Sequence, residues 1–273
     1  MAVIDIKGII VSQNTIDAAG AGMISKLLEA AGKDRSVAAV VLDMETPGGG
    51  VTASDELHHA VQKLREAGKP VVTCMGSVGA SGGYLVAAGT DYIIANRLTL
   101  TGSIGVIAST LNYAGLFDKV GLHTEIYKSG KMKDALHGGR ERTPEEKALI
   151  QDIVASNFYE FAVLVAEGRS RFETTDDVLA AEFADGRVMT GAQALDYGLV
   201  DELGYFDDAV SKARELGQAP NARVVRFRPP LRLRDLFFAS PLTRMFGLEK
   251  LVPASLRHLQ TGQFYYLLPG AVQ

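Results

Sequence analysis

Short apolar runs alternate with helical patterns through the first 130 residues of the chain. Four runs have the length and the β-branched content of buried strands, at residues 3–11, 37–42, 71–75 and 92–95. Amphipathic stretches typical of helices separate them, at residues 16–31 and 52–67. This order predicts an α/β fold whose largely parallel sheet is covered by helices. A further strand is expected at residues 124–127.

Two glycine-rich turns follow predicted strands, Pro47–Gly50 and Gly79–Gly83. The second lies in an uncharged stretch, residues 70–90, that is long enough to cross a bilayer. Its many glycines and serines favour a buried strand, a tight turn and a helix of small residues, so we expect no transmembrane span there. Because ligands gather at the carboxyl ends of parallel strands, the two turns together predict a shared site.

A polar, glycine-containing segment over residues 130–142 is expected to be a loop. The helix that follows has a clear beginning. Thr143 can cap it, Pro144 suits its first position, and Glu146 completes a capping box.

The composition is that of a globular protein, with 47% apolar and 22% charged residues among 273. A single cysteine, Cys74, excludes an intramolecular disulfide and a multi-cysteine metal cluster. The net charge of −4 argues against a chain that binds nucleic acid through overall basicity. No histidine pair has HExxH spacing, so we expect no metal.

The charge is unevenly distributed along the chain. Residues 223–273 carry eight basic and two acidic residues, together with several aromatics. We therefore predict two parts, a main domain over residues 1–222 and a basic, aromatic extension over residues 223–273.

Ser81 is the candidate nucleophile, because glycines around it allow a sharp strand-to-helix turn and a helix N-terminus supplies N–H groups for an oxyanion. The string also satisfies G-x-S-x-G. A Ser-His-Asp arrangement would need His123, His137 or His258 as base. The other candidate base is a lysine of the segment containing Lys128, Lys131 and Lys133, whose pKa must then fall by roughly 3 units through burial.

Several motifs occur together and in order along the chain. They are Asp43-x-x-x-Pro47-Gly48-Gly49-Gly50, Gly79-Ala80-Ser81-Gly82-Gly83-Tyr84, Leu100-Thr101-Gly102-Ser103-Ile104-Gly105, Ser129-Gly130-x-x-Lys133-Asp134, Arg140-x-x-Thr143-x-Glu145-Glu146 and Asp185-Gly186-Arg187-Val188. In this combination the chain resembles the signal peptide peptidase A (SppA) family in its short, single-repeat form, from about Val3 onwards.

The resemblance implies a Ser/Lys dyad on a ClpP/crotonase-like fold of stacked ββα units. Ser81 matches the nucleophile, Lys133 the general base and Ser103 the hydroxyl that holds the lysine amine. The backbone N–H groups of Gly82 and of Gly49, or Gly48 in its place, match the oxyanion hole. Lys128 and Lys131 do not fall on the position of the base. No cofactor is implied.

In such enzymes the base comes from a neighbouring repeat or subunit, and this chain has one segment of each kind. The resemblance therefore implies a ring-like homo-oligomer with shared sites, which degrades signal peptide remnants and other extended hydrophobic peptides within or beside the membrane. Residues 264–268, Phe-Tyr-Tyr-Leu-Leu, are similar to the family's C-terminal segment, and we expect them in a neighbour's cleft as a product or a brake.

Family members usually carry an N-terminal membrane anchor, whereas this sequence starts at its first predicted strand with no signal peptide. A membrane enzyme acting on the extracytoplasmic side, its anchor trimmed, is one expectation, and a cytoplasmic member is the other. Three alternative functions remain open from the sequence. They are a Ser-His-Asp hydrolase, a crotonase-like acyl-CoA enzyme, and a non-catalytic scaffold of the same fold.

Overall fold

Parallel strands form the centre of the computed structural model, which describes residues 1–12, 19–228 and, by backbone, 265–267. The main sheet has the strand order β10-β7-β6-β4-β1-β11, and every neighbouring pair on this path is parallel. Its strands are β1 (Ala2–Lys7), β4 (Val40–Thr46), β6 (Val71–Ala80), β7 (Tyr92–Ala95), β10 (Glu202–Leu203) and β11 (Val225–Phe227). The predicted α/β class with a largely parallel sheet is confirmed.

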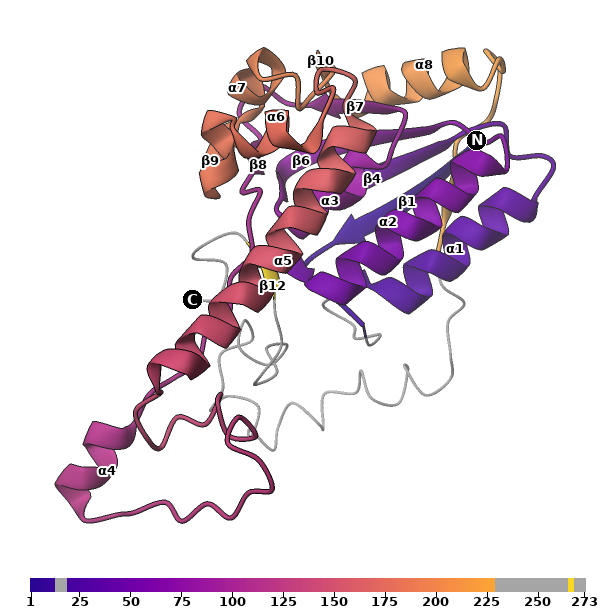
Figure 1. The fold of residues 1–273 in the computed structure, drawn as a ribbon. Coiled ribbons are helices and arrows are strands. Elements are labelled where there is room, and N and C mark those ends of the chain that lie inside the picture. Colours follow the sequence, from indigo (N-terminus) through magenta and orange to yellow (C-terminus); the bar gives the residue numbers. More distant parts are fainter. Residues whose placement is uncertain (13–18, 229–264, 268–273) are drawn as a thin grey trace, which may run out of the picture.

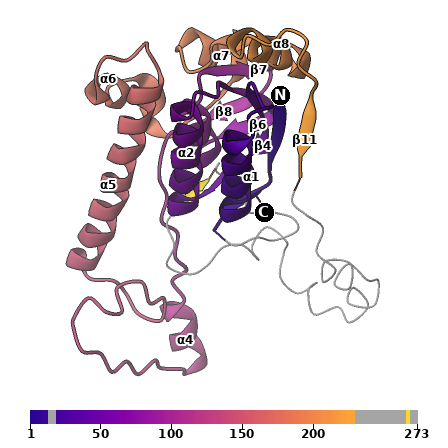
Figure 2. The same ribbon diagram turned by 90° about the vertical axis from the view of Figure 1, so that its right-hand side faces the viewer.

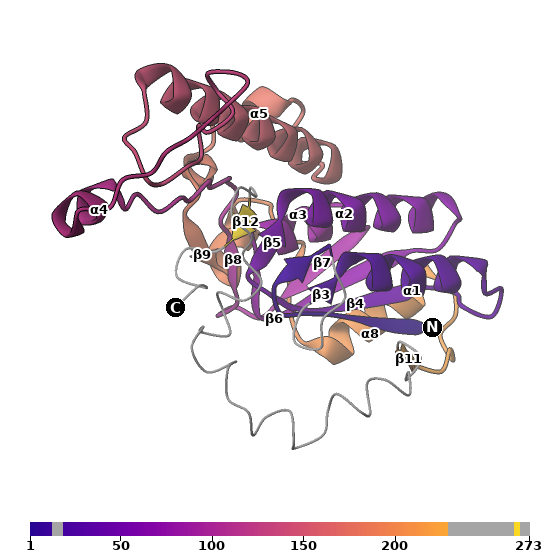
Figure 3. The same ribbon diagram turned by 90° about the horizontal axis from the view of Figure 1, so that it is seen from below.

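Side chains that alternate along the strands feed two cores, one on each face of the sheet. Ile4 and Leu42 point into the larger core, and Val3 and Val41 into the smaller one. Three helices cover the larger core: α1 (Ala21–Lys33), α2 (Val51–Glu66) and α3 (Gly82–Ala88). Helix α8 (Phe206–Leu216) covers the other face (Figure 3). Because both faces are covered, the strands can be apolar throughout.

Short strands gather at the carboxyl edge of the main sheet. Strand β8 (Leu100–Gly102) pairs with the end of β6 and with β9 (Val188–Thr190). A second sheet has the order β12-β5-β2-β3, with β2 (Ile10–Val11), β3 (Ala19–Gly20), β5 (Gly48–Gly50) and β12 (Tyr265–Leu267). Both predicted glycine-rich turns therefore lie at this edge.

An arm, residues 105–143, leaves the body after β8 and carries helix α4 (Ala114–Val120), none of whose residues is buried. Helix α5 (Pro144–Gly168) leads the chain back to the body, where Phe161, Ala162 and Val165 are buried (Figures 1 and 2). Three further helical segments and β9 complete this side, namely α6 (Thr175–Leu179), the 3₁₀ helix η1 (Glu182–Asp185) and α7 (Gly191–Asp196).

Most predicted elements match the structure, but three differ from it. The single strand expected at residues 3–11 is divided into β1 and β2, which belong to different sheets, and the helix expected from residue 16 begins at Ala21, directly after β3. The expected capping box at the start of α5 is present, with both reciprocal bonds between Thr143 and Glu146. The strand expected at residues 124–127 is wrong, because this segment lies in the arm, where no neighbouring strand is available to pair with it. Within the described residues, α5 is the one helix long and apolar enough to cross a membrane by length and composition, a criterion that core helices of soluble proteins also meet.

The boundary at residue 222 stays a prediction. Strand β11, immediately beyond it, pairs in parallel with β1 and so belongs to the main sheet. Most of the basic extension, residues 229–264 and 268–273, lies outside the described residues.

Candidate active site

Ser81 stands at the junction of β6 and α3 in a backbone conformation that is rare for a residue with a side chain. Its φ is 53° and its ψ is −119°. Two backbone bonds hold this conformation, since the Ser81 N–H donates to Gly102 O at 2.8 Å and the Leu85 N–H donates to Ser81 O at 2.9 Å. Ser81 is fully buried, and its Oγ has no hydrogen-bond partner among the described residues. A strained strand-to-helix turn with an unengaged hydroxyl is the geometry of a nucleophile elbow.

Glycines on both sides of Ser81 let neighbouring elements approach closely. A Cβ on Gly83 would lie 2.5 Å from Thr46 Cγ2, and one on Gly79 would lie 2.8 Å from the Met75 side chain. Such distances leave no room for a methyl group. The glycines therefore allow the start of α3 to pack directly on the carboxyl end of β4.

Ser103 occupies the position beside Ser81 on the neighbouring strand. Ala80 of β6 is paired with Gly102 of β8. Ser81 is the next residue after Ala80, and Ser103 is the next residue after Gly102. Ser103 also has a positive φ, 50°, and is buried. Its N–H donates to Arg187 O at 2.8 Å. The Asp185–Val188 motif thus holds the backbone that carries Ser103.

The glycine strand β5 lies near α3, the helix that begins after Ser81. The Gly48 N–H donates to Thr46 Oγ1 at 3.1 Å and is therefore engaged within the chain. Gly49 packs so closely on β2 that a Cβ there would lie 1.9 Å from Ile10 O. Gly82 begins α3, where the first N–H groups of a helix have no intrahelical acceptor.

Strand β12 runs antiparallel along the free edge of β5, with Tyr266 opposite Gly49. Its backbone also lies near α3, the helix that Ser81 caps. We expected the C-terminal segment in a neighbour's cleft, whereas in this single chain its described part lies on the chain's own glycine strand.

Lys133 lies in the loop that joins α4 to α5, and Figures 1 and 2 show this loop at the end of the arm that is away from the main sheet. The residue is exposed, and its Nζ has no hydrogen bond or ion pair within the described part of the chain. Lys131 is exposed as well, and Lys128 pairs with Asp134. A single chain therefore does not bring any of these lysines to Ser81.

The histidines considered as bases do not meet Ser81 either. His123 and His137 both belong to the arm, where the His137 ring lies edge-on to Tyr113 with centroids 6.1 Å apart. His258 lies outside the described residues. His58 is buried on α2, against Gly89 at the far end of α3 from Ser81, and burial lowers its pKa. No described histidine bonds to the Ser81 hydroxyl.

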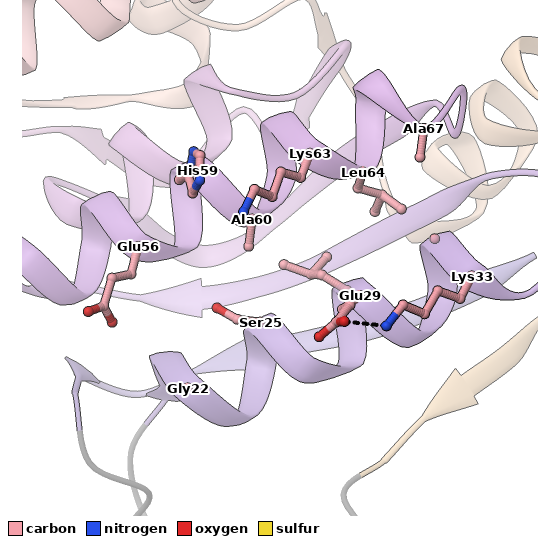
Figure 4. Close-up of a pocket in the computed structure, with 12 residues that line it drawn as sticks. Gly22, Ser25, Glu29, Lys33, Glu56, His59, Ala60, Lys63, Leu64 and Ala67 are labelled. Carbon is pink, nitrogen blue, oxygen red and sulfur yellow. Dashed lines mark hydrogen bonds and ion pairs between the residues drawn. The ribbon is translucent and has the colours of Figure 1, made fainter.

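The body also has a groove of about 640 Å³ between α1 and α2. Its lining includes Ser25, His59 and the ion pair of Glu29 with Lys33 (Figure 4). None of its lining residues belongs to β5, β6 or α3, so it is separate from the Ser81 site. Cys74 is no rival nucleophile, because burial raises the pKa of its thiol to about 12.

Two supporting residues were not identified from the sequence. The Thr101 hydroxyl donates to Gly79 O at 2.7 Å and ties β8 to the strand that leads to Ser81. Thr46 receives the Gly48 N–H. A threonine two residues before a glycine is a known signal for such a turn, and it stands in the sequence as Thr46-Pro47-Gly48.

Comparison with known proteins gives the family. Relatives include a candidate signal peptide peptidase SppA of Enterococcus faecium, 38% identical over 72% of this chain and 56% of its own length. Protease 4 of Haemophilus influenzae is 35% identical over 79% of this chain and 34% of its own length. The chain thus spans little more than half of the former relative and a third of the latter.

A solved structure of the 1510-N membrane-bound stomatin-specific protease, a serine-to-alanine mutant, has the same fold, with a TM-score of 0.52 at 17% identity over 84% of this chain and 97% of that one. Residues 63–219 match the model of peptidase family S49, and this stretch contains Ser81, Ser103 and Lys133. The resemblance to the SppA family is thereby confirmed: the chain belongs to peptidase family S49.

Proposed function

We propose that the protein is a serine endopeptidase in which Ser81 attacks the peptide carbonyl and Lys133 of a second copy acts as general base. The observation that carries the proposal is the buried Ser81 hydroxyl, held at a strained turn with no hydrogen-bond partner among the residues that the structure describes. A hydroxyl is a weak nucleophile unless a base accepts its proton. Since the arm holds Lys133 away from the body, another copy is the natural source of that base.

In the acylation step the Ser81 Oγ bonds to the carbonyl carbon while its proton passes to the neutral Lys133 amine. The ammonium then protonates the leaving amine as the peptide bond breaks, and in deacylation water takes the place of the serine. The Gly82 N–H and the Gly49 N–H would stabilise the oxyanion. Gly49 is favoured over Gly48 because Thr46 already accepts the Gly48 N–H.

Ser103 would orient the incoming amine. It lies beside Ser81 across the β6–β8 pair and is buried. Entry into such a site removes the amine from water, and burial lowers the pKa of a lysine towards the range that a base needs.

Extended hydrophobic peptides are the proposed substrates, signal peptide remnants among them. The free edge of β5 accepts an extended chain, as its pairing with β12 demonstrates. Relatives named as signal peptide peptidase and as protease 4 support this class. Such remnants remain in membranes, so we place the enzyme at the extracytoplasmic face of the cell membrane.

The arm supports the proposal of a ring-like homo-oligomer with shared sites. Its exposed apolar side chains need a protein partner in water, and five of the largest are Leu111, Leu116, Val120, Leu122 and Tyr127. If a second copy covers this surface, the loop with Lys133 is carried to that copy as well.

Mixing two inactive variants tests the proposal. Ser81→Ala and Lys133→Ala should each abolish peptide cleavage while the assembly elutes unchanged, and His123→Ala should remain active. Mixed in equal amounts under exchange conditions, the two inactive variants should recover about a quarter of the wild-type rate, because a site then needs a serine from one variant and a lysine from the other. A mixture that stays inactive although subunits exchange would show that each site is built within one chain.

The C-terminal strand is proposed as a brake, since its backbone occupies the edge of β5 that a substrate would use. Truncation after Gly262 should raise the initial rate and the affinity for peptide inhibitors. Unchanged rate and affinity would rule out this role.

A further inference from the structure

The loop that carries Lys133 is tied to α5 by a cluster of four charged side chains, Lys128, Asp134, Arg140 and Glu146. One carboxylate oxygen of Asp134 accepts from Lys128 Nζ at 2.6 Å, and the other accepts from Arg140 Nε at 2.8 Å. Arg140 also donates to both carboxylate oxygens of Glu146, at 2.8 and 2.5 Å. We refer to these residues as the ion-pair cluster.

The cluster connects Lys133 to a rigid element. Asp134 is the next residue along the chain from Lys133. At the other end, Glu146 accepts the Thr143 N–H at 2.9 Å and completes the capping box of α5. The loop therefore has a continuous chain of charge-assisted bonds from the residue beside the base to the first turn of a 25-residue helix.

The two carboxylates are shielded from water, with side-chain exposures of 8% for Asp134 and 3% for Glu146. Arg140, and then Lys128, hold the pKa of Asp134 far below its usual value. Arg140 and the Thr143 N–H lower the pKa of Glu146 to about 2. Both groups are thus charged at neutral pH, and two cations balance two anions within the cluster.

We propose that the ion-pair cluster positions the Lys133 amine for catalysis and, because the cluster is electrically neutral, leaves neither of its own carboxylates free to hold that amine protonated. Asp134, Arg140 and Glu146 are positioning residues in this view, because they act through Lys133 rather than on the substrate. The inference rests on the proposed function. It also explains why the Lys133-Asp134 and Arg140-x-x-Thr143 motifs occur in one chain.

Arg140→Gln is the informative variant. It leaves the cluster with one unbalanced negative charge beside Lys133, which favours the protonated amine. The acid limb of the profile of kcat/KM against pH should move up by about half to one pH unit. The plateau should also fall by about 10- to 100-fold, because the charged link from Asp134 through Arg140 to Glu146 is lost, although Arg142 still donates to Ala135 O and Leu136 O.

Three variants separate charge balance from other effects. Asp134→Asn combined with Arg140→Gln restores neutrality, so the acid limb should return to its wild-type pH while the plateau stays low. Arg140→Lys keeps the charge and should leave the limb in place. Lys131→Gln removes a nearby positive charge that is outside the cluster, and should move the limb less than Arg140→Gln.

Three variants change the cluster alone: Arg140→Gln, Arg140→Lys, and Asp134→Asn combined with Arg140→Gln. The other charged or titratable groups of the loop and its surroundings are the same in all three, so their effects cancel when these variants are compared. They are Glu125, Lys131, His137, Glu141, Arg142 and Glu145. Assembly is checked by elution volume for each variant.

The outcomes distinguish this inference from the function on which it rests. Suppose that Arg140→Gln has the wild-type acid limb and plateau of kcat/KM against pH, while Lys133→Ala is inactive. The positioning role of the cluster would then be overturned, and the proposed dyad would stand. Equal shifts for Lys131→Gln and Arg140→Gln would reduce the effect to general electrostatics and likewise overturn it. An active Lys133→Ala variant would remove the dyad, and with it the inference.

Discussion

The buried Ser81 hydroxyl should make the protein less stable than it would be without it. Its Oγ is shielded from water and has no hydrogen-bond partner in the described part of the chain. An unsatisfied buried polar group costs about 1–3 kcal/mol, and Ser81→Ala removes that cost at the expense of a void the size of one oxygen atom. We expect a net gain of about 1 kcal/mol. For a domain of this size that raises Tm by about 2–4 °C.

The measurement is thermal unfolding followed by circular dichroism, with Lys133→Ala as the parent. In that parent no amine from another copy can pair with the hydroxyl, so the comparison with the Ser81→Ala double variant isolates the unsatisfied group.

Two controls fix the interpretation. Ser54 is also fully buried, and its hydroxyl has no partner within residues 1–12 and 19–228, but it lies on the regular helix α2. Ser54→Ala should therefore stabilise by at least as much and leave catalysis unchanged in the wild-type background. Thr101→Val removes a hydroxyl that does have a partner, Gly79 O, and should destabilise. A drop in Tm for Ser81→Ala would mean that its hydroxyl is bonded in the folded chain, and the argument from an unengaged nucleophile would fail.

Three further predictions concern other parts of the chain. Gly49→Ala should lower kcat/KM at least about 100-fold in a peptide assay, because its Cβ would lie 1.9 Å from Ile10 O, whereas Gly50→Ala, with 3.8 Å to its nearest neighbour, should be tolerated. Cys74, whose pKa burial raises to about 12, should react with iodoacetamide only after unfolding, as followed by mass spectrometry. Glu146 has a folded pKa of about 2, below its ordinary value of 4.5, so its stabilisation is complete above pH ~4.5 and is lost as the pH falls towards 2. Hydrogen exchange of the arm, relative to the intrinsic rate at each pH, should accelerate in that window, and Glu146→Gln should reduce this pH dependence to the part that Asp134 contributes.

The sheet and its helices could be predicted because local pattern and tertiary structure agree there. Helix α2 was expected at residues 52–67 and lies at Val51–Glu66, and β7 has the expected bounds. Strand β6, in contrast, continues through its glycines to Ala80. That continuation depends on pairing with β8, a partner far along the chain that no local pattern reveals.

The sequence predicts which residues are candidates for the site, but not their backbone conformation or their position in the folded chain. Gly-x-Ser-x-Gly indicates a nucleophile, but Ser103, with its positive φ, is held by a bond from its N–H to Arg187 O, more than eighty residues later in the chain. The location of Lys133 likewise depends on the arm, which local periodicity describes poorly because α4 buries none of its residues. Whether Lys133 becomes buried is a property of an assembly, and stays a prediction.

The division of the chain into a rigid body and an arm has a consequence for control of activity. The body supplies the proposed nucleophile and the proposed N–H donors, on strands and helix ends that are fixed by backbone bonds. The arm carries the proposed base. Ion pairs within the arm stiffen it, but the arm extends away from the body to which it is attached (Figure 1). A newly folded single chain would therefore hold a nucleophile without a base and could not cleave peptides. Proteolysis would begin only on assembly, so the rate per subunit should fall steeply with dilution below the dissociation constant of the assembly.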